Sequence, residues 1–156
     1  MPTITSFLAF TDKAEEAATF YCSVFPGAKI LSTTPYPDIP VAPKPGLAMV
    51  VEVELNGQRY IFMNGGDHFR FTDAFSLAVE CETQAEIDRY WDALVAGGGE
   101  HGPCGWLKDR FGVSWQVIPK NIAALIGSGA RAKRVMEAVM QSTKLDIATL
   151  ERAARG

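Results

Sequence analysis

The sequence contains few of the side chains that hold transition metals. It has only two histidines, His68 and His101. Its three cysteines, Cys22, Cys81 and Cys104, are an odd number in no metal-binding spacing. A cysteine-based zinc module is therefore not expected, and a reducing cytoplasm is the expected location.

The chain also lacks long apolar runs and a strong excess of positive charge. No stretch is apolar over the length that a membrane span needs, and the N-terminus has neither the basic start nor the apolar run of a signal peptide. The net charge of −3 argues against nucleic acid as a partner. With 156 residues, 47% of them hydrophobic, we expect a single domain, 1–156, with a real core.

The charge is unevenly spread along the sequence. Residues 120–156 hold seven Lys/Arg and three Asp/Glu, a net charge of +4, which leaves −7 on residues 1–119. Such a basic tail favours docking onto the acidic body or onto a second subunit. A solvated helix face is the alternative interpretation.

Residues 3–67 predict a strand, a helix and three further strands. Asp12, with Glu15 three residues later, has the pattern of a capping box, and an apolar stripe at helical spacing follows. Five prolines make 34–46 a loop or arm. The expected elements are a strand at 3–10, a helix from Asp12 with the stripe Ala17, Phe20, Tyr21, Val24 and Phe25, a strand at 28–33, and a hairpin of 47–55 with 59–64 around Asn56-Gly57.

Residues 73–119 repeat this order. A strand at 75–81 precedes a capping box, Thr83 to Glu86, and a second stripe ends at Gly97–Gly99. The second stripe is Ile87, Tyr90, Trp91, Leu94 and Val95, each 70 residues after a member of the first. The repeat predicts an α+β fold of paired βαβββ modules, 3–67 and 73–119, with a C-terminal helical tail, 120–156.

The tail itself shows two helical signals. The apolar residues Ala132, Val135, Met136, Val139 and Met140 recur at helical spacing. Asp146 is a candidate N-cap for a final helix carrying Ile147 and Leu150.

The stretch Cys104–Pro119 predicts two short strands joined by a tight turn at Asp109–Gly112. Alternation places Ser114, Gln116 and Ile118 on one face, and Trp115 and Val117 on the other. Gln116 is thus a lone amide on a strand otherwise suited to burial, and a buried amide needs a hydrogen-bond partner.

The motif Asp109-Arg-Phe-Gly-Val-Ser-Trp-Gln116 resembles the last strand of the vicinal-oxygen-chelate superfamily, which includes glyoxalase I and bleomycin- and fosfomycin-resistance proteins. The longer string from Cys104 resembles its PhnB-like branch, often labelled 3-demethylubiquinone-9 3-methyltransferase. The resemblance runs from about Ile4 to the C-terminus. It implies paired βαβββ modules around a cavity, and it implies homodimers, in which we expect segment 34–46 or 121–156 to cross onto the partner.

In the resembled superfamily, four side chains from the first and last strands of both modules hold a divalent metal. The corresponding positions here are Ser6, Ile61, Ser76 and Gln116. None is a strong metal ligand, and a shift of one residue introduces none. We therefore expect no metal and no other cofactor. The two histidines are interpreted as structural or loop residues, with His68 the weaker alternative ligand.

The remaining chemistry is that of a small-molecule site lined by aromatic and a few polar side chains. Because alternation divides the aromatics between faces, some must be core. The candidates are Gln116, Trp106, Trp115, Cys104, Ser76, Ser6 and Phe62, with Tyr60 a further possible wall. Cys104 is either an inert small side chain or, near Lys108 and Arg110, a reactive thiol.

Three functions remain open. Binding or sequestering a small organic molecule in a metal-free cavity fits the missing ligands. An enzyme of the same superfamily, a lyase, isomerase or dioxygenase relative with a non-standard site, is the alternative. Methyl transfer fits least, because the common methyltransferases need a glycine-rich loop after the first strand, whereas Gly97–Gly99 follows a helix.

Overall fold

The computed structural model describes residues 1–40, 42 and 44–156. Two compact units, residues 1–71 and 72–156, each contain their own sheet. Both units have the element order strand, helix, three strands, so the α+β fold of paired βαβββ modules with a C-terminal helical tail is confirmed. Val41 and Pro43 of the predicted Pro-rich arm lie outside the described residues.

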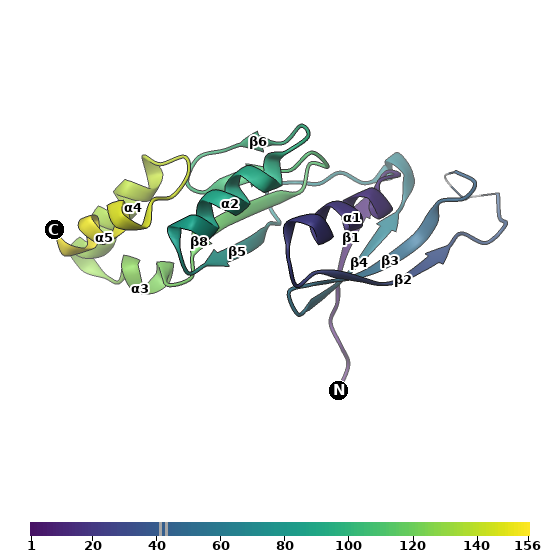
Figure 1. Ribbon diagram of the computed structural model, residues 1–156, viewed down its shortest axis with the longest axis horizontal. Coiled ribbons are helices and arrows are strands. Elements are labelled where there is room, and N and C mark those ends of the chain that lie inside the picture. The colour runs from purple at the N-terminus through teal and green to yellow at the C-terminus, as the bar shows by residue number, and fades with distance from the viewer. Residues whose placement is uncertain (41, 43) are drawn as a thin grey trace. The chain divides into compact units, whose positions relative to one another are not determined.

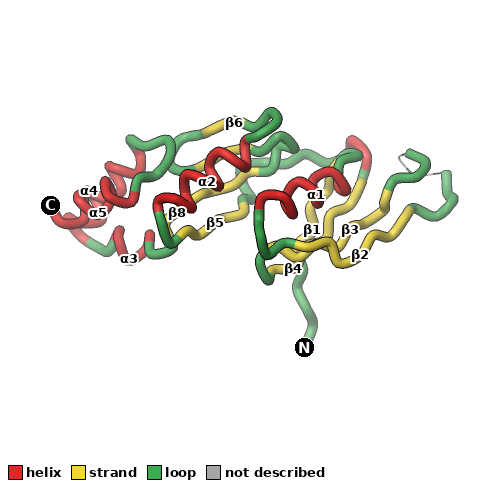
Figure 2. Tube along the Cα trace, viewed as in Figure 1, coloured by secondary structure: helices red, strands yellow, loops and turns green. Residues whose placement is uncertain are grey.

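The first unit is one helix packed on a four-stranded sheet (Figure 1). The strand order is β1-β4-β3-β2, and β1 is parallel to β4 while the other neighbours are antiparallel. Figure 2 shows α1 lying across one face of this sheet. The elements are β1 (Ser6–Phe10), α1 (Ala14–Val24), β2 (Lys29–Pro35), β3 (Ala48–Leu55), β4 (Gln58–Asn64) and a short 3-10 helix, η1 (Gly66–His68).

Two local predictions for this unit are confirmed. The hairpin between β3 and β4 turns at Asn56-Gly57, where φ is 47° and 91°, positive at both positions as a type I′ turn requires. All members of the apolar stripe of α1 are buried against the sheet: Ala17, Phe20, Tyr21, Val24 and Phe25.

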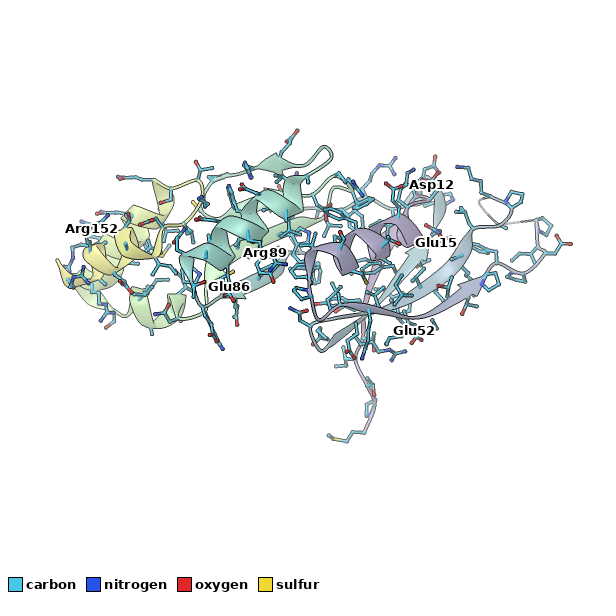
Figure 3. The ribbon with its side chains drawn as sticks, in the orientation of Figure 1. Asp12, Glu15, Glu52, Glu86, Arg89 and Arg152 are labelled. Atoms are coloured by element: carbon cyan, nitrogen blue, oxygen red, sulfur yellow. The ribbon has the colours of Figure 1, made fainter. Side chains whose placement is uncertain are left out.

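The predicted capping box at Asp12 is wrong. The helix begins at Ala14, and no side chain at its N-cap, Lys13, bonds the first turn. Instead Asn64, at the end of β4, accepts a hydrogen bond from the Ala14 amide at 2.9 Å and donates to Glu15 at 2.8 Å. Asp12 pairs with Lys44 at 2.9 Å (Figure 3 labels Asp12 and Glu15 at the start of α1). The helix is therefore capped by a residue distant in sequence.

The second unit repeats this arrangement and adds the helical tail. Its sheet has the order β5-β8-β7-β6, with β5 parallel to β8, and α2 packs on one face. The elements are β5 (Leu77–Cys81), α2 (Gln84–Val95), β6 (Glu100–His101), β7 (Trp106–Lys108), β8 (Ser114–Pro119), α3 (Ile122–Ile126), α4 (Gly129–Met140) and α5 (Ile147–Arg155).

The capping box of α2 is confirmed. Thr83 Oγ1 accepts a hydrogen bond from the Glu86 amide at 3.2 Å, and the Glu86 carboxylate accepts from the Glu82 amide at 2.7 Å. The reciprocal bond thus reaches one residue further back than in the usual motif. His101, expected in a loop, forms the end of β6 and stacks on Trp91 with ring centroids 4.4 Å apart.

The tail folds as three helices around a small apolar core. Leu125, Val135, Leu145 and Leu150 are buried together, and Ile118 of β8 packs against them. Asp146 caps α5 as predicted, accepting from the Thr149 amide at 2.7 Å.

Two members of the predicted α4 stripe are not core. Met136 and Met140 are 39% and 70% exposed, because α4 meets its neighbouring helices mainly through Val135 and Val139. The helix that this stripe predicts is present as α4, and these two methionines lie on its exposed side. No helix in the described part of the chain combines the length and hydropathy that a membrane crossing requires.

Candidate functional site

The sheet of the second unit buries one face under α2 and presents polar side chains on the other, which we call the far face. Trp115 and Val117 of β8 are 3% and 0% exposed on the α2 side. Strand pairing sets Trp106 opposite Gln116 and Lys108 opposite Ser114. Because cross-strand partners share a face, these four side chains all belong to the far face.

A pocket of about 450 Å³ opens beside β7 in this unit. Trp106, Pro103 and Cys104 form apolar walls. The polar side chains of the lining are Lys108, Asp73, Ser114, His101 and Glu100, and Glu100 pairs across the strands with Lys108. The volume falls within the usual range for small-molecule sites. The pocket therefore combines an indole surface with a cation on alternate residues of one strand.

Three of the polar groups of the pocket, Lys108, Ser114 and Asp73, form a hydrogen-bonded set. The Lys108 ammonium lies 3.1 Å from Asp73 Oδ1, and the Ser114 hydroxyl donates to the same oxygen at 3.1 Å. The hydrogen bond from Lys108, followed by that from Ser114, lowers the pKa of Asp73 from its ordinary value. Asp73 is therefore an anion at neutral pH, and this side of the pocket holds an ion pair.

The Pro103–Trp106 turn shapes the other side of the pocket. The Trp106 amide donates to the Pro103 carbonyl at 3.0 Å, and φ is 60° at Cys104 and 81° at Gly105. Positive φ at both central residues is the mark of a type I′ turn, and it is uncommon for a cysteine. The turn carries Cys104 at the pocket wall and leads directly into Trp106.

Five of the seven predicted site residues lie in the second unit, and four of them face the pocket side of the sheet or its turn. Trp106 and Cys104 line the pocket. Gln116 lies opposite Trp106 and donates to the Ser76 hydroxyl at 2.9 Å, so the lone amide has a partner from the protein. Gln116 and Ser76 therefore lie together, beside the pocket rather than in its wall.

The other predicted site residues lie elsewhere. Trp115 is core on the α2 side, and its indole N–H donates to Asp109 at 2.8 Å. Phe62, in the first unit, is fully buried and packs on Phe10 with ring centroids 5.2 Å apart. Ser6 pairs with Tyr60 on the face of the first sheet that α1 covers.

The position of Ser6 follows from the true offset of the repeat. Leu8 pairs with Phe62 as Val79 pairs with Val117, so the first strands of the two units are related by 71 residues. The helices are related by 70 residues, which is the spacing at which Ser6 corresponds to Ser76. A difference of one residue moves a strand position to the opposite face.

The side chains available do not fit the metal that the superfamily resemblance implies. The far face offers the neutral Gln116 and Ser76, already bonded to each other. His101 has its Nε2 at 3.2 Å from the Trp91 carbonyl and stacks on the Trp91 ring. Across residues 1–40, 42 and 44–156, no three His, Cys, Asp or Glu side chains gather closely enough to hold a metal ion.

Among the polar side chains that line the pocket, sequence reasoning missed Lys108, Ser114, Asp73, Glu100 and His101 as ligand contacts. The first two could have been found, since they alternate with Trp106 and Gln116 on the same strands. Asp73 lies in the segment before β5, and only the folded chain brings it to Lys108.

The cysteines differ in their environments. Burial, reinforced by the charge of Glu86, raises the pKa of Cys81 to about 11, so its thiol is neutral at physiological pH. Burial also raises the pKa of Cys22. All three cysteines are free, and of these only Cys104 lines the pocket.

Known proteins match the chain over the two modules. The family model described as 3-demethylubiquinone-9 3-methyltransferase matches residues 2–118. A PhnB protein from Bacillus cereus with that same description is 36% identical, with a TM-score of 0.66 over 75% of this chain and 99% of its own. A search of curated protein sequences found no match.

More distant structures share the fold alone. A Pseudomonas aeruginosa protein is 21% identical, with a TM-score of 0.61 over 76% of this chain and 98% of its own. The fosfomycin resistance protein FosX from Listeria monocytogenes is 15% identical, with a TM-score of 0.53 over 75% of this chain and 91% of its own. With more than half of its length matched by the family model, and with 36% identity to the PhnB protein, the chain belongs to the 3-demethylubiquinone-9 3-methyltransferase family.

Proposed function

We propose that the chain binds a small organic molecule with a planar apolar body and an anionic group, in the pocket beside β7 and without a metal. The observation that carries this proposal is the placement of Trp106 and Lys108 on one face of one strand, at a pocket of about 450 Å³. An indole face suits a planar body, and an ammonium suits an anion. A ligand anion would compete with Asp73, whose side chain is 70% exposed, for Lys108.

The aromatic anion 8-anilinonaphthalene-1-sulfonate tests this proposal, because its own emission reports binding. Trp106→Ala is expected to weaken its affinity about tenfold, on the order of 1.4 kcal/mol, since a large contact surface is lost. Lys108→Ala is expected to weaken binding of the sulfonate but not of an uncharged analogue.

The matched control is Phe69→Ala, which removes an aromatic side chain that is 48% exposed in the first unit. Its affinity for the probe should equal that of the wild type. Equal losses in Trp106→Ala and Phe69→Ala, or no loss in either, would show that the probe binds elsewhere.

Metal analysis provides a second test. We expect no stoichiometric zinc, nickel, manganese or iron in the purified protein, because neutral amide and hydroxyl groups do not offset the dehydration of a divalent ion. Gln116→Glu alone should not create tight binding, since one carboxylate leaves the other ligand positions unfilled. Stoichiometric metal that disappears on mutation of Gln116 would reject a metal-free site.

Methyl transfer is less well supported than binding. The common methyltransferase fold is a doubly wound parallel sheet with a glycine-rich loop after its first strand. The two sheets here are four-stranded, and each contains antiparallel neighbours. The homodimer and the cytoplasmic location stay predictions, supported by exposed apolar side chains such as Phe7 and by the free cysteines.

A further inference from the structure

The C-terminal tail contacts the wall of the pocket at one point. The family match ends at residue 118, so the tail lies beyond the part of the chain that the family model covers. Between α4 and α5, the segment 142–145 passes along the outside of the Pro103–Trp106 turn. We call this segment the tail clamp.

The tail clamp completes the hydrogen bonding of that turn. In a type I′ turn the closing bond joins the outer residues and leaves the two central amides without a partner inside the turn. Here the Cys104 amide donates to the Ser142 carbonyl and the Gly105 amide to the Thr143 carbonyl, both at 2.8 Å. Consecutive carbonyls of the tail thus satisfy consecutive amides of the pocket wall.

Packing supports the same arrangement. A Cβ atom placed on Gly105 would lie 3.1 Å from Leu145 Cδ1 and 3.0 Å from the Val117 carbonyl oxygen. Leu145 is only 1% exposed and belongs to the core of the tail. The turn is therefore held closely between β8 and the tail, and the φ of 81° at its second central position favours glycine there.

One side chain of α2 anchors the clamp. Gln84 Nε2 donates to the Leu145 carbonyl at 3.1 Å, and Gln84 Oε1 accepts from the Ile147 amide at 2.8 Å. Both ends of this amide thus bond the tail, and its Nε2 also donates to Asp88 Oδ1 at 3.0 Å within α2. The neighbouring Lys144–Asp88 ion pair, at 2.8 Å, is partly exposed and contributes little.

We propose that the tail clamp is a positioning element of the binding pocket, which holds Cys104 in its left-handed conformation and thereby sets the wall that precedes Trp106. A non-glycine residue at positive φ is strained and persists where its surroundings enforce it. The surroundings here are the two carbonyls and the leucine of the tail. The effect on ligand affinity rests on the proposed function, whereas the effect on the turn does not.

Amide hydrogen exchange of the full-length protein tests the effect on the turn. In Gln84→Ala we expect exchange at Cys104 and Gly105 to accelerate about tenfold through local opening. The amides of Gly112 and Val113, bonded to Asp109 within the β7–β8 turn, should keep their wild-type rates. Lys144→Ala is the matched control, because it alters the same segment without removing a bond to Gln84.

Thiol labelling gives an independent measurement. In a Cys22→Ser background, iodoacetamide should modify Cys104 about tenfold faster in Gln84→Ala than in Lys144→Ala if the same local opening limits access. Cys81 should stay unmodified in both, since its thiol is buried and neutral. Unchanged rates at Cys104 and Gly105, or equal acceleration at Gly112 and Val113, would overturn the proposal, because either outcome makes the clamp only a contributor to global stability.

The ligand readout separates the two proposals. If the sulfonate probe binds the wild type, Gln84→Ala should weaken it while Lys144→Ala does not. If the probe binds neither protein but the turn opens in Gln84→Ala, the proposed function fails and the role of the clamp in holding the turn stands. Unchanged affinity despite an opened turn would overturn the positioning role.

Discussion

Asn64→Ala is expected to lower the free energy of unfolding by about 3 kcal/mol. Asn64 is fully buried and makes three hydrogen bonds, to the Ala14 amide, to the Glu15 carboxylate and to the Ala48 carbonyl, at 2.8–2.9 Å. Alanine would leave buried groups of α1 and β3 without this partner. Urea denaturation followed by circular dichroism measures the change as a lower midpoint at constant m-value.

Asp12→Ala is the informative control for this prediction. The sequence pattern predicts that Asp12 caps α1. In the structure Asp12 instead makes a partly exposed ion pair with Lys44. Its hydrogen bond with Lys44 lowers the pKa of Asp12. Its removal should lower the stability far less than Asn64→Ala does, because water screens an exposed ion pair. A larger loss of stability in Asp12→Ala than in Asn64→Ala would favour a local capping box at Asp12. It would contradict a cap formed by Asn64 of β4.

Asp109→Ala is expected to cost about 3 kcal/mol as well, in the second unit. The Asp109 carboxylate is 3% exposed and accepts from the amides of Phe111 and Val113 and from the Trp115 indole, at 2.8–3.0 Å. It therefore holds the β7–β8 turn and fixes the indole of Trp115. Without it, three donors lose their acceptor.

A double-mutant cycle with Trp115→Phe isolates the indole bond. The coupling between Asp109→Ala and Trp115→Phe should be about 1.5 kcal/mol, as expected for a hydrogen bond to a charged group. Asp73→Ala, which removes a largely exposed carboxylate of the same unit, should change stability far less than Asp109→Ala does. Zero coupling in the cycle would mean that Asp109 acts through the turn amides alone.

Much of the fold could be predicted because its signals are local. The helical stripe ending at Phe25, the Asn56-Gly57 turn and the Thr83 capping box each depend on residues a few positions apart, and each is present in the structure. The cap of α1 could not be predicted in this way. The cap joins the Ala14 backbone amide to the side chain of Asn64, 50 residues later. No local pattern around Asp12 shows that the side chain of a distant residue caps the helix.

The candidate site was predictable to the extent that strand alternation applied. The two-residue alternation of β8 separates Trp115 from Gln116. The strand pairing in the structure then sets Trp106 on the same face as Gln116. The prediction for Ser6 is wrong because the helices of the two units are 70 residues apart, whereas their first strands are 71 apart. In a strand, an error of one residue moves a side chain to the opposite face. Asp73 required tertiary structure, since no periodicity links it to Lys108.

The arginines of α4 bear on how the positive charge of the tail is used. Arg131 donates to the carbonyls of Ala124 and Leu125 at the end of α3, and Arg134 donates to those of Ala153 and Ala154 at the end of α5. These cations neutralise the negative ends of two helix dipoles.

The lysines at the two junctions of the tail are likewise paired within the unit. Lys120 lies 2.7 Å from Glu82, and Lys144 lies 2.8 Å from Asp88. Four of the seven cations counted between residues 120 and 156 thus serve the fold of their own unit, so the formal charge of the tail overstates the attraction left for an acidic partner. Replacing Glu82 or Asp88 by a neutral residue would release that charge to solvent and give the surface an electrostatic field that the native pairing cancels.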